Sequence, residues 1–174
     1  MSQNTELEYS QETTLDTGKP ILLIVEDNEE IQKYIVESFT DSFEVITANN
    51  GEEGTQQALS RIPDIVVSDI MMPVMDGITL CKQLKDDVRT SHIPIILLTA
   101  KDSLQDKEEG YEVGADSYLT KPFSASLLRS RINNLLDSRK KLVAQFQAQS
   151  TPGNQIDLSE KRIVIALSLI HISE

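Results

Sequence analysis

The sequence predicts an α/β fold in which a parallel five-stranded sheet is covered by helices on both faces. Three observations lead to this prediction. Five short apolar segments occur between residues 21 and 120, segments with helical periodicity separate them, and nearly every strand is apolar throughout rather than alternating. Strands of this kind are buried on both faces, which is typical of parallel sheets with crossover helices. At 174 residues, the chain is long enough for one such domain with extra length at its ends.

The first strand is expected at Ile21 to Val25, where five apolar residues follow one another. The other four strands are expected at residues 44–48, 64–69, 94–99 and 116–120. Right-handed crossovers leave few ways to connect such strands. In these folds, ligands bind beyond the carboxyl ends of the strands.

Residues that favour helix caps precede several of the predicted helices. Asn28 can cap a helix from residue 29 to about 40, and Asp76 can cap one after residue 76. The turn 49–51 leads into a helix to about residue 61, a polar helix runs from about 103 to 111, and a last helix runs from near Ser124 through Phe146. Apolar residues expected on the inner faces are Ile31, Tyr34, Ile35, Phe39, Ile78, Leu80, Cys81 and Leu84.

The chain divides into three parts. Residues 1–19 are polar without periodicity and are expected to be a flexible leader or linker. The folded domain is expected at residues 20–138, and residues 139–174 are expected to be a helical extension and an irregular tail. Within that tail, the uncharged apolar segment 163–172 is either a strand of a missing domain or not native to the protein, and we favour the second interpretation.

Charge and cysteine content exclude several classes of protein. The net charge of −12 disfavours contact with nucleic acid or with anionic membranes. A single cysteine cannot form an internal disulfide, which suits a reducing, cytoplasmic location. The polar N-terminus is not a signal peptide, and no apolar run is long enough to span a bilayer.

Polar side chains with related chemistry follow the carboxyl ends of four predicted strands. Glu26 and Asp27 follow the first strand, and Asp69 ends the third. Thr99 ends the fourth strand, and Lys121 follows the fifth. Each residue alone has an ordinary structural explanation, such as a helix cap or an exposed lysine. Their occurrence together at one edge of a sheet is hard to explain without a shared site.

The chemistry of this set suits phosphoryl transfer. Carboxylates that crowd together repel one another unless cations compensate, and Mg²⁺ prefers oxygen ligands and accepts phosphate oxygens. Asp69 could then act both as a metal ligand and as a nucleophile that forms an aspartyl phosphate. Mg²⁺ and the Lys121 ammonium would stabilise charge on the transferred phosphoryl group.

Residues 20–138 resemble a response-regulator receiver domain of two-component signalling. The matching segments are Ile24-Val25-Glu26-Asp27-Asn28, Ser68-Asp69-Ile70-Met71-Met72-Pro73-Val74-Met75-Asp76-Gly77, Leu97-Leu98-Thr99-Ala100 and Gly114-Ala115-Asp116-Ser117-Tyr118-Leu119-Thr120-Lys121-Pro122-Phe123. The resemblance implies a flavodoxin-like (βα)5 fold with strand order 2-1-3-4-5. It also implies a cis bond between Lys121 and Pro122.

The resemblance further implies a role for each site residue. Asp69 accepts a phosphoryl group from a histidine kinase in a phosphorelay, and Lys121 contacts that group. Asp27, Asp69 and the backbone carbonyl of Met71 bind Mg²⁺, and Glu26 supports the metal through water. Thr99 and Tyr118 form the conformational switch. Many members carry aspartate where this chain has Glu26, so the resemblance leaves open which contact the longer side chain makes with the metal's water.

The parent protein and partners are expected from the same resemblance. The segment Leu127 to Lys140 resembles receivers of hybrid sensor histidine kinases, in which an AraC-type DNA-binding output often follows. The expected output is therefore transcription. Members of the family often form homodimers through the fourth helix, fifth strand and fifth helix. The domain alone is not expected to be a stand-alone enzyme, although it assists its own phosphorylation and dephosphorylation.

Three alternatives fit the residues less well. A phosphatase of the haloacid-dehalogenase type also uses an aspartate nucleophile, but it needs a second aspartate at position 71, which is Met. A nucleotide-binding module needs a glycine-rich loop after the first strand, where this chain has acids from Glu26 to Glu30. A pseudo-receiver that acts only as a binding module would lack the acids, Thr99 or Lys121.

Overall fold

Five parallel strands form a single sheet. The computed structural model describes residues 18–100 and 112–149. The strands are β1 (Ile21–Val25), β2 (Glu44–Ala48), β3 (Ile65–Asp69), β4 (Ile95–Thr99) and β5 (Ser117–Thr120). Their order in the sheet is β2-β1-β3-β4-β5, and every pair of neighbours is parallel. This arrangement confirms the predicted α/β doubly wound fold and its strand order.

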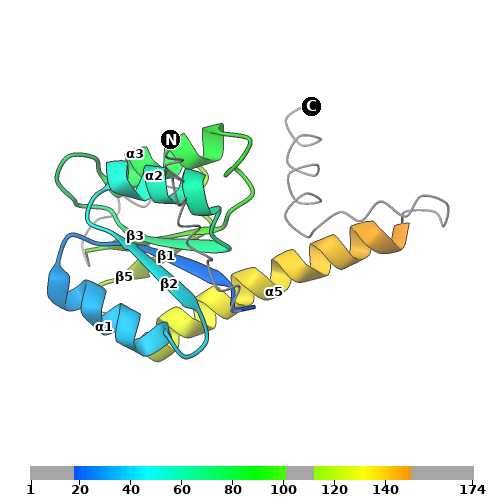
Figure 1. Ribbon diagram of the computed structural model, residues 1–174, viewed down its shortest axis with the longest axis horizontal. Helices are drawn as coiled ribbons and strands as arrows, with labels where there is room; N and C mark the ends of the chain where they lie inside the picture. Colours follow the sequence, from blue (N-terminus) through cyan, green and yellow to red (C-terminus); the bar gives the residue numbers. More distant parts are fainter. Residues whose placement is uncertain (1–17, 101–111, 150–174) are drawn as a thin grey trace, which may run out of the picture.

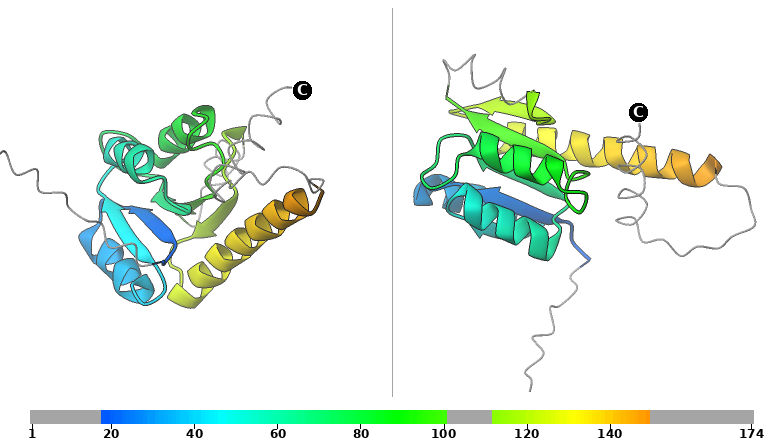
Figure 2. Two further views of the ribbon diagram at one scale, coloured as in Figure 1. Left: turned by 45° about the vertical axis from the view of Figure 1, so that its right-hand side comes forward. Right: turned by 90° about the horizontal axis from the view of Figure 1, so that it is seen from above.

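Helices cover both faces of the sheet. In the described part of the chain they are α1 (Glu29–Phe39), α2 (Gly51–Arg61), α3 (Gly77–Asp86) and α5 (Ala125–Gln149). The helices α1 and α5 lie on one face, whereas α2 and α3 lie on the other (Figures 1 and 2). The polar helix predicted at 103–111, residues 1–17 of the predicted leader and the tail after residue 149 lie outside the described residues. Among the described helices, none is both long and apolar enough to cross a membrane.

Side-chain caps define where the helices begin. The Asn28 carboxamide accepts hydrogen bonds from the amides of Glu30 and Ile31, and the Asp76 carboxylate accepts one from the amide of Thr79. Both caps confirm the prediction, because each satisfies a backbone N–H group that the first turn leaves without a helical partner. Asn50 caps α2 in the same way.

Three strands begin one residue later than predicted. Asp64, Pro94 and Asp116 each precede a strand rather than start it. The Asp64 carboxylate accepts a hydrogen bond from the Ile21 amide at 2.7 Å, and Asp116 accepts one from the Ile95 amide at 2.8 Å. These two carboxylates therefore tie the amino ends of neighbouring strands together.

The core consists of one apolar layer on each face of the sheet. Successive residues of β1 and β3 alternate between the layers, so Leu22 faces α1 and α5 whereas Leu23 faces α2 and α3. The layer beneath α1 and α5 includes Ile35, Phe39, Leu128 and Ile132, all fully buried. Full burial of each such side chain contributes about 1.5–3 kcal/mol. The two layers hold the strand ends, and hence the site, in fixed register.

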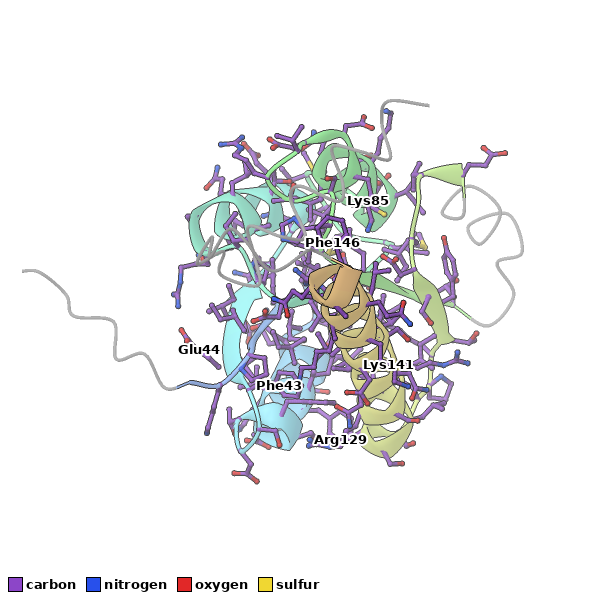
Figure 3. The ribbon with its side chains drawn as sticks, turned by 90° about the vertical axis from the view of Figure 1, so that its right-hand side faces the viewer. Phe43, Glu44, Lys85, Arg129, Lys141 and Phe146 are labelled. Atoms are coloured by element: carbon purple, nitrogen blue, oxygen red, sulfur yellow. The ribbon has the colours of Figure 1, made fainter. Side chains whose placement is uncertain are left out.

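The start of α5 is fixed to α1 by polar contacts. Tyr34 is half exposed rather than buried as predicted, and its hydroxyl accepts a hydrogen bond from the Ala125 amide at 3.0 Å. The Arg129 guanidinium lies 4.6 Å from the centre of the Phe39 ring and donates hydrogen bonds to the Ser38 carbonyl and the Ser42 hydroxyl. Figure 3 looks along α5, with Arg129 near its beginning and Phe146 near its end.

Candidate functional site

The sheet brings four predicted site residues to one edge. Glu26 and Asp27 directly follow β1, Asp69 is the last residue of β3, and Lys121 directly follows β5. Strands β1 and β3 are neighbours, so their carboxyl ends meet. A ligand that binds beyond this edge can therefore contact side chains from the ends of several strands.

Three carboxylates form a compact cluster at this edge. One oxygen from each of Glu26, Asp27 and Asp69 lies within 4.8 Å of the other two. Glu26 is 1% exposed and Asp69 is 8% exposed, whereas Asp27 is exposed to solvent. Three carboxylates this close repel one another strongly, and a hard divalent cation with oxygen ligands relieves that repulsion. The donor set therefore fits Mg²⁺.

Lys121 joins two of the three carboxylates. Its ammonium nitrogen lies 2.9 Å from Oε2 of Glu26 and 2.9 Å from Oδ2 of Asp69. The peptide bond between Lys121 and Pro122 is cis, as the resemblance implies. The Lys121 amide also donates a hydrogen bond to the Thr99 carbonyl at 2.8 Å, which ties the loop after β5 to the end of β4. One cation thus partly neutralises the cluster from within the protein.

The ionisation of Glu26 and Lys121 reflects this partly buried pair. Burial raises the pKa of Glu26, the negative charge of Asp69 adds to that effect, and hydrogen bonds from Lys121 and Asn28 oppose it. Burial alone would lower the pKa of Lys121, but hydrogen bonds to Asp69 and Glu26 and their charges outweigh it, so this pKa is raised. Lys121 therefore remains a cation at physiological pH.

Both oxygens of Glu26 already have hydrogen-bond donors. Oε1 accepts the Asn28 amide at 3.1 Å, and Oε2 accepts the Lys121 ammonium. The glutamate side chain, one methylene longer than aspartate, thus folds back onto its own turn and across to Lys121. In this arrangement Asp27 and Asp69 are better placed than Glu26 to offer oxygens to a cation directly.

The remaining predicted site residues lie around the cluster without joining it. Thr99 is fully buried at the end of β4, and its hydroxyl donates to the Ala100 carbonyl at 3.2 Å. Tyr118 lies on β5, partly buried against the core layer beneath α2 and α3. Met71 is 73% exposed in the loop that follows β3.

Gly77 is a residue of the site that the strand-end argument missed. A Cβ atom on Gly77 would lie 2.1 Å from the backbone oxygen of Asp69, closer than any side chain could tolerate. The Gly77 amide donates to the Ile70 carbonyl at 2.8 Å, which brings the start of α3 back to the end of β3. The Asp76-Gly77 pair in the sequence signals a helix start, but it does not reveal how closely the backbones approach.

Val74 occupies an unusual backbone conformation in the loop between β3 and α3. Its φ is 69°, and the Met75 amide donates to the Pro73 carbonyl at 2.8 Å, so Val74 is the centre of a γ-turn with positive φ. Such turns are rare and strained, especially for a β-branched residue. A valine gives no sequence signal for this conformation, which is why it was not predicted.

Comparison with known proteins agrees with this geometry. The family model for the response regulator receiver domain matches residues 22–133. Over 128 residues the chain is 41% identical to Histidine kinase P4 of Formosa agariphila, covering 74% of this chain and 9% of that protein. It is 42% identical over 116 residues to the transcriptional regulatory protein PhoP of Bacillus subtilis, covering 66% of this chain and 48% of that protein. The chain thus spans less than half the length of either relative.

A solved structure agrees as well. The receiver domain of sensor histidine kinase PA1611 from Pseudomonas aeruginosa was solved with a magnesium ion coordinated in its active site cleft. It superimposes with a TM-score of 0.64 at 27% identity, covering 68% of this chain and 98% of that one. Since the family model covers more than half of the chain, and the sheet order and acidic strand ends fit it, this chain belongs to the response regulator receiver domains of two-component signalling.

Proposed function

We propose that this receiver accepts a phosphoryl group on Asp69 from the phosphohistidine of a histidine kinase. The observation that carries the proposal is the convergence of three carboxylates within 4.8 Å, with the Lys121 ammonium 2.9 Å from Asp69. Asp69 is the candidate nucleophile because it ends a central strand and lies within reach of both Asp27 and Lys121. Aspartate is an established nucleophile for phosphoryl transfer.

In the proposed reaction, one carboxylate oxygen of Asp69 attacks the phosphorus atom. The bond between phosphorus and the donor's imidazole nitrogen breaks, and its electron pair stays on that nitrogen. Lys121 is placed to contact the transferred phosphoryl oxygens while it remains bonded to Glu26. The protein would accelerate this step mainly by positioning the reacting groups and by compensating the negative charge of the phosphoryl oxygens.

A magnesium ion would be held by Asp27, Asp69 and the Met71 carbonyl, with Glu26 acting through water. Such an ion supplies positive charge to the phosphoryl oxygens. The hydrogen bonds that engage both oxygens of Glu26 support the water-mediated role for this residue. The magnesium ion in the related Pseudomonas aeruginosa receiver supports the choice of metal.

We further propose that Thr99 and Tyr118 respond to phosphorylation. The new group carries about −1.5 to −2 charges and three acceptor oxygens. Thr99 would give up its bond to the Ala100 carbonyl and donate to one of these oxygens, and Tyr118 would move with the end of β4. To convert the domain almost completely from one state to the other, phosphorylation must favour the second state by about 5.5 kcal/mol.

The output is proposed to be transcription, within a longer hybrid histidine kinase. One relative is a histidine kinase and another is a transcriptional regulatory protein, and this chain covers only part of each. An AraC-type output and a homodimer remain predictions, because the fourth helix of the proposed dimer face lies outside the described residues.

The proposal is tested by intact mass after incubation with acetyl phosphate and Mg²⁺. Wild type should gain the mass of one phosphoryl group, and Asp69→Asn should gain none. Asp137→Asn, the same change at an exposed position of α5, is the matched control and should behave as wild type. A mass gain that persists in Asp69→Asn would refute Asp69 as the acceptor, and no gain in wild type would favour a pseudo-receiver.

A further inference from the structure

A glutamine of α1 lies behind the acidic turn that follows β1. Gln32 is partly buried, and its side-chain amide reaches the ends of two strands. We infer that Gln32 is a positioning residue that fixes the turn carrying Glu26 and Asp27 in the geometry required to bind a cation. This inference rests on the proposed magnesium site and adds to it a residue that does not touch the metal.

Three oxygens surround the Gln32 side-chain nitrogen. It lies 3.0 Å from the Glu26 carbonyl oxygen, 3.3 Å from the Ala48 carbonyl oxygen and 3.3 Å from Oδ1 of Asn49. The Ala48 carbonyl also accepts the Glu26 amide at 3.0 Å. Gln32 thus extends the β1–β2 pairing by one contact beyond the last regular pair, Val25 with Ala48.

The carbonyl of Glu26 belongs to the peptide unit that joins Glu26 to Asp27. Holding this carbonyl fixes the plane of the peptide, and hence the position of the Asp27 Cα atom from which the side chain extends. Asn49 is itself held by Glu53, whose carboxylate accepts the Asn49 amide at 2.9 Å and its side-chain amide at 3.2 Å. Gln32 therefore contacts an asparagine that is itself held by a residue of α2.

Fixing this turn matters because the cluster opposes its own assembly. The carboxylates of Glu26, Asp27 and Asp69 repel one another, and the exposed Asp27 is free to swing toward solvent unless its backbone is held. Mg²⁺ demands near-ideal octahedral geometry, so small displacements of a ligand lower its affinity. Removal of an outer hydrogen bond of this kind costs about 10–100-fold in metal affinity.

Charge and positioning make opposite predictions for one substitution. Gln32→Glu keeps the shape of the side chain but replaces the donor by a carboxylate facing three oxygens. A purely electrostatic effect of the added negative charge would tighten Mg²⁺ binding. If Gln32 acts by positioning, the lost hydrogen bonds and the new repulsion weaken binding despite that charge.

The experiment is calorimetric titration of the full chain with MgCl2. Gln32→Ala and Gln32→Glu should each raise the dissociation constant by about tenfold or more. Gln56, an exposed residue of α2, provides the matched controls Gln56→Ala and Gln56→Glu, which should bind as wild type does. Unchanged affinity in Gln32→Ala, or tighter binding in Gln32→Glu, would overturn the inference.

Two further measurements separate this inference from loss of structure and from failure of the proposed site. Urea unfolding reports whether a variant is merely less stable, which by itself would leave the affinity of the folded fraction unchanged. The amides of Glu26 and Asn28 donate to the Ala48 carbonyl and to Oε1 of Glu26, and their hydrogen exchange, without metal, should be faster in both Gln32 variants. If wild type binds no Mg²⁺, the proposed magnesium site is wrong. The exchange rates test the positioning role separately, because unchanged exchange at these amides in the Gln32 variants would reject that role whether or not the metal binds.

Discussion

At the scale of single residues, the strand-end rule located the charged part of the site. Glu26, Asp69 and Lys121 could be predicted to meet because carboxyl ends of parallel strands share one edge. The rule could not reveal that Lys121 joins Glu26 to Asp69, since that depends on the reach of side chains. Gln32 was missed for the same reason, because its neighbours are backbone oxygens that every sequence possesses.

Cys81 gives a prediction that concerns pH. Burial raises the pKa of its thiol to about 11, with a smaller opposing effect from Lys85 and a reinforcing one from Asp116. Because the folded-state pKa lies above the ordinary value of 9.0, its contribution to stability is complete below pH 9.0 and is lost as the pH rises through about 11. The thiolate is the reactive form.

We therefore expect iodoacetamide near pH 8 to leave Cys81 unmodified in the native protein and to modify it in urea. Mass spectrometry follows the reaction. The free energy of unfolding of wild type relative to Cys81→Ala should also fall as the pH is raised above 9.0. Rapid alkylation of the native protein would contradict the burial of this thiol.

At the scale of elements, apolar runs and capping residues predicted the strands and most helix starts to within about one residue. These features follow from local chemistry, such as the caps at Asn28 and Asp76. Tyr34 departs from its predicted burial because its hydroxyl caps α5, a tertiary contact with a residue 91 positions away. The turn at Val74 departs because nothing in a valine favours positive φ.

The junction of β3 and α3 yields a second prediction. Alanine usually stabilises a helix relative to glycine by about 1 kcal/mol. Gly77→Ala should instead destabilise the domain by about 1–3 kcal/mol, because its Cβ would meet the backbone oxygen of Asp69, which cannot move away without distorting β3. Urea unfolding measures the change.

Ser130→Ala, at an exposed position of α5, is the control for helix propensity and should be neutral or slightly stabilising. Because the clash is with Asp69 itself, Gly77→Ala should also slow the gain of a phosphoryl group from acetyl phosphate. A variant as stable and as readily phosphorylated as wild type would show that the junction can relax.

At the scale of the whole molecule, charge and metal binding determine stability together. The net charge of −12 already disfavours the compact state, and the carboxylate cluster adds local repulsion. The sign of the net charge could be read from the composition. The gathering of three carboxylates within 4.8 Å of one another could not be read from the composition, because it depends on the completed sheet.

Mg²⁺ should therefore raise the melting temperature of the whole domain. At a free concentration about 100 times the dissociation constant, a ligand that binds only the folded state adds about 2.7 kcal/mol of stability. Asp27→Asn should lose this gain and, because it removes one of three repelling charges, should be at least as stable as wild type without metal. Thermal unfolding with and without Mg²⁺ measures both effects.

Asp137→Asn carries the same loss of charge at an exposed position outside the cluster, so it should keep the full response to Mg²⁺. An equal gain in wild type and Asp27→Asn would mean that the ion stabilises the protein through its overall charge rather than at the proposed site.

The helix α5 has a mechanical consequence. It is held near its start by Tyr34. It is held again at Arg139, whose guanidinium donates to the Asp64 carbonyl at 3.1 Å, directly before the amino end of β3. About 21 Å of helix separates Ala125 from Arg139, and about 15 Å more leads to Gln149. We expect such a helix to carry a small displacement of its start to its far end as one rigid body, without unfolding a single turn.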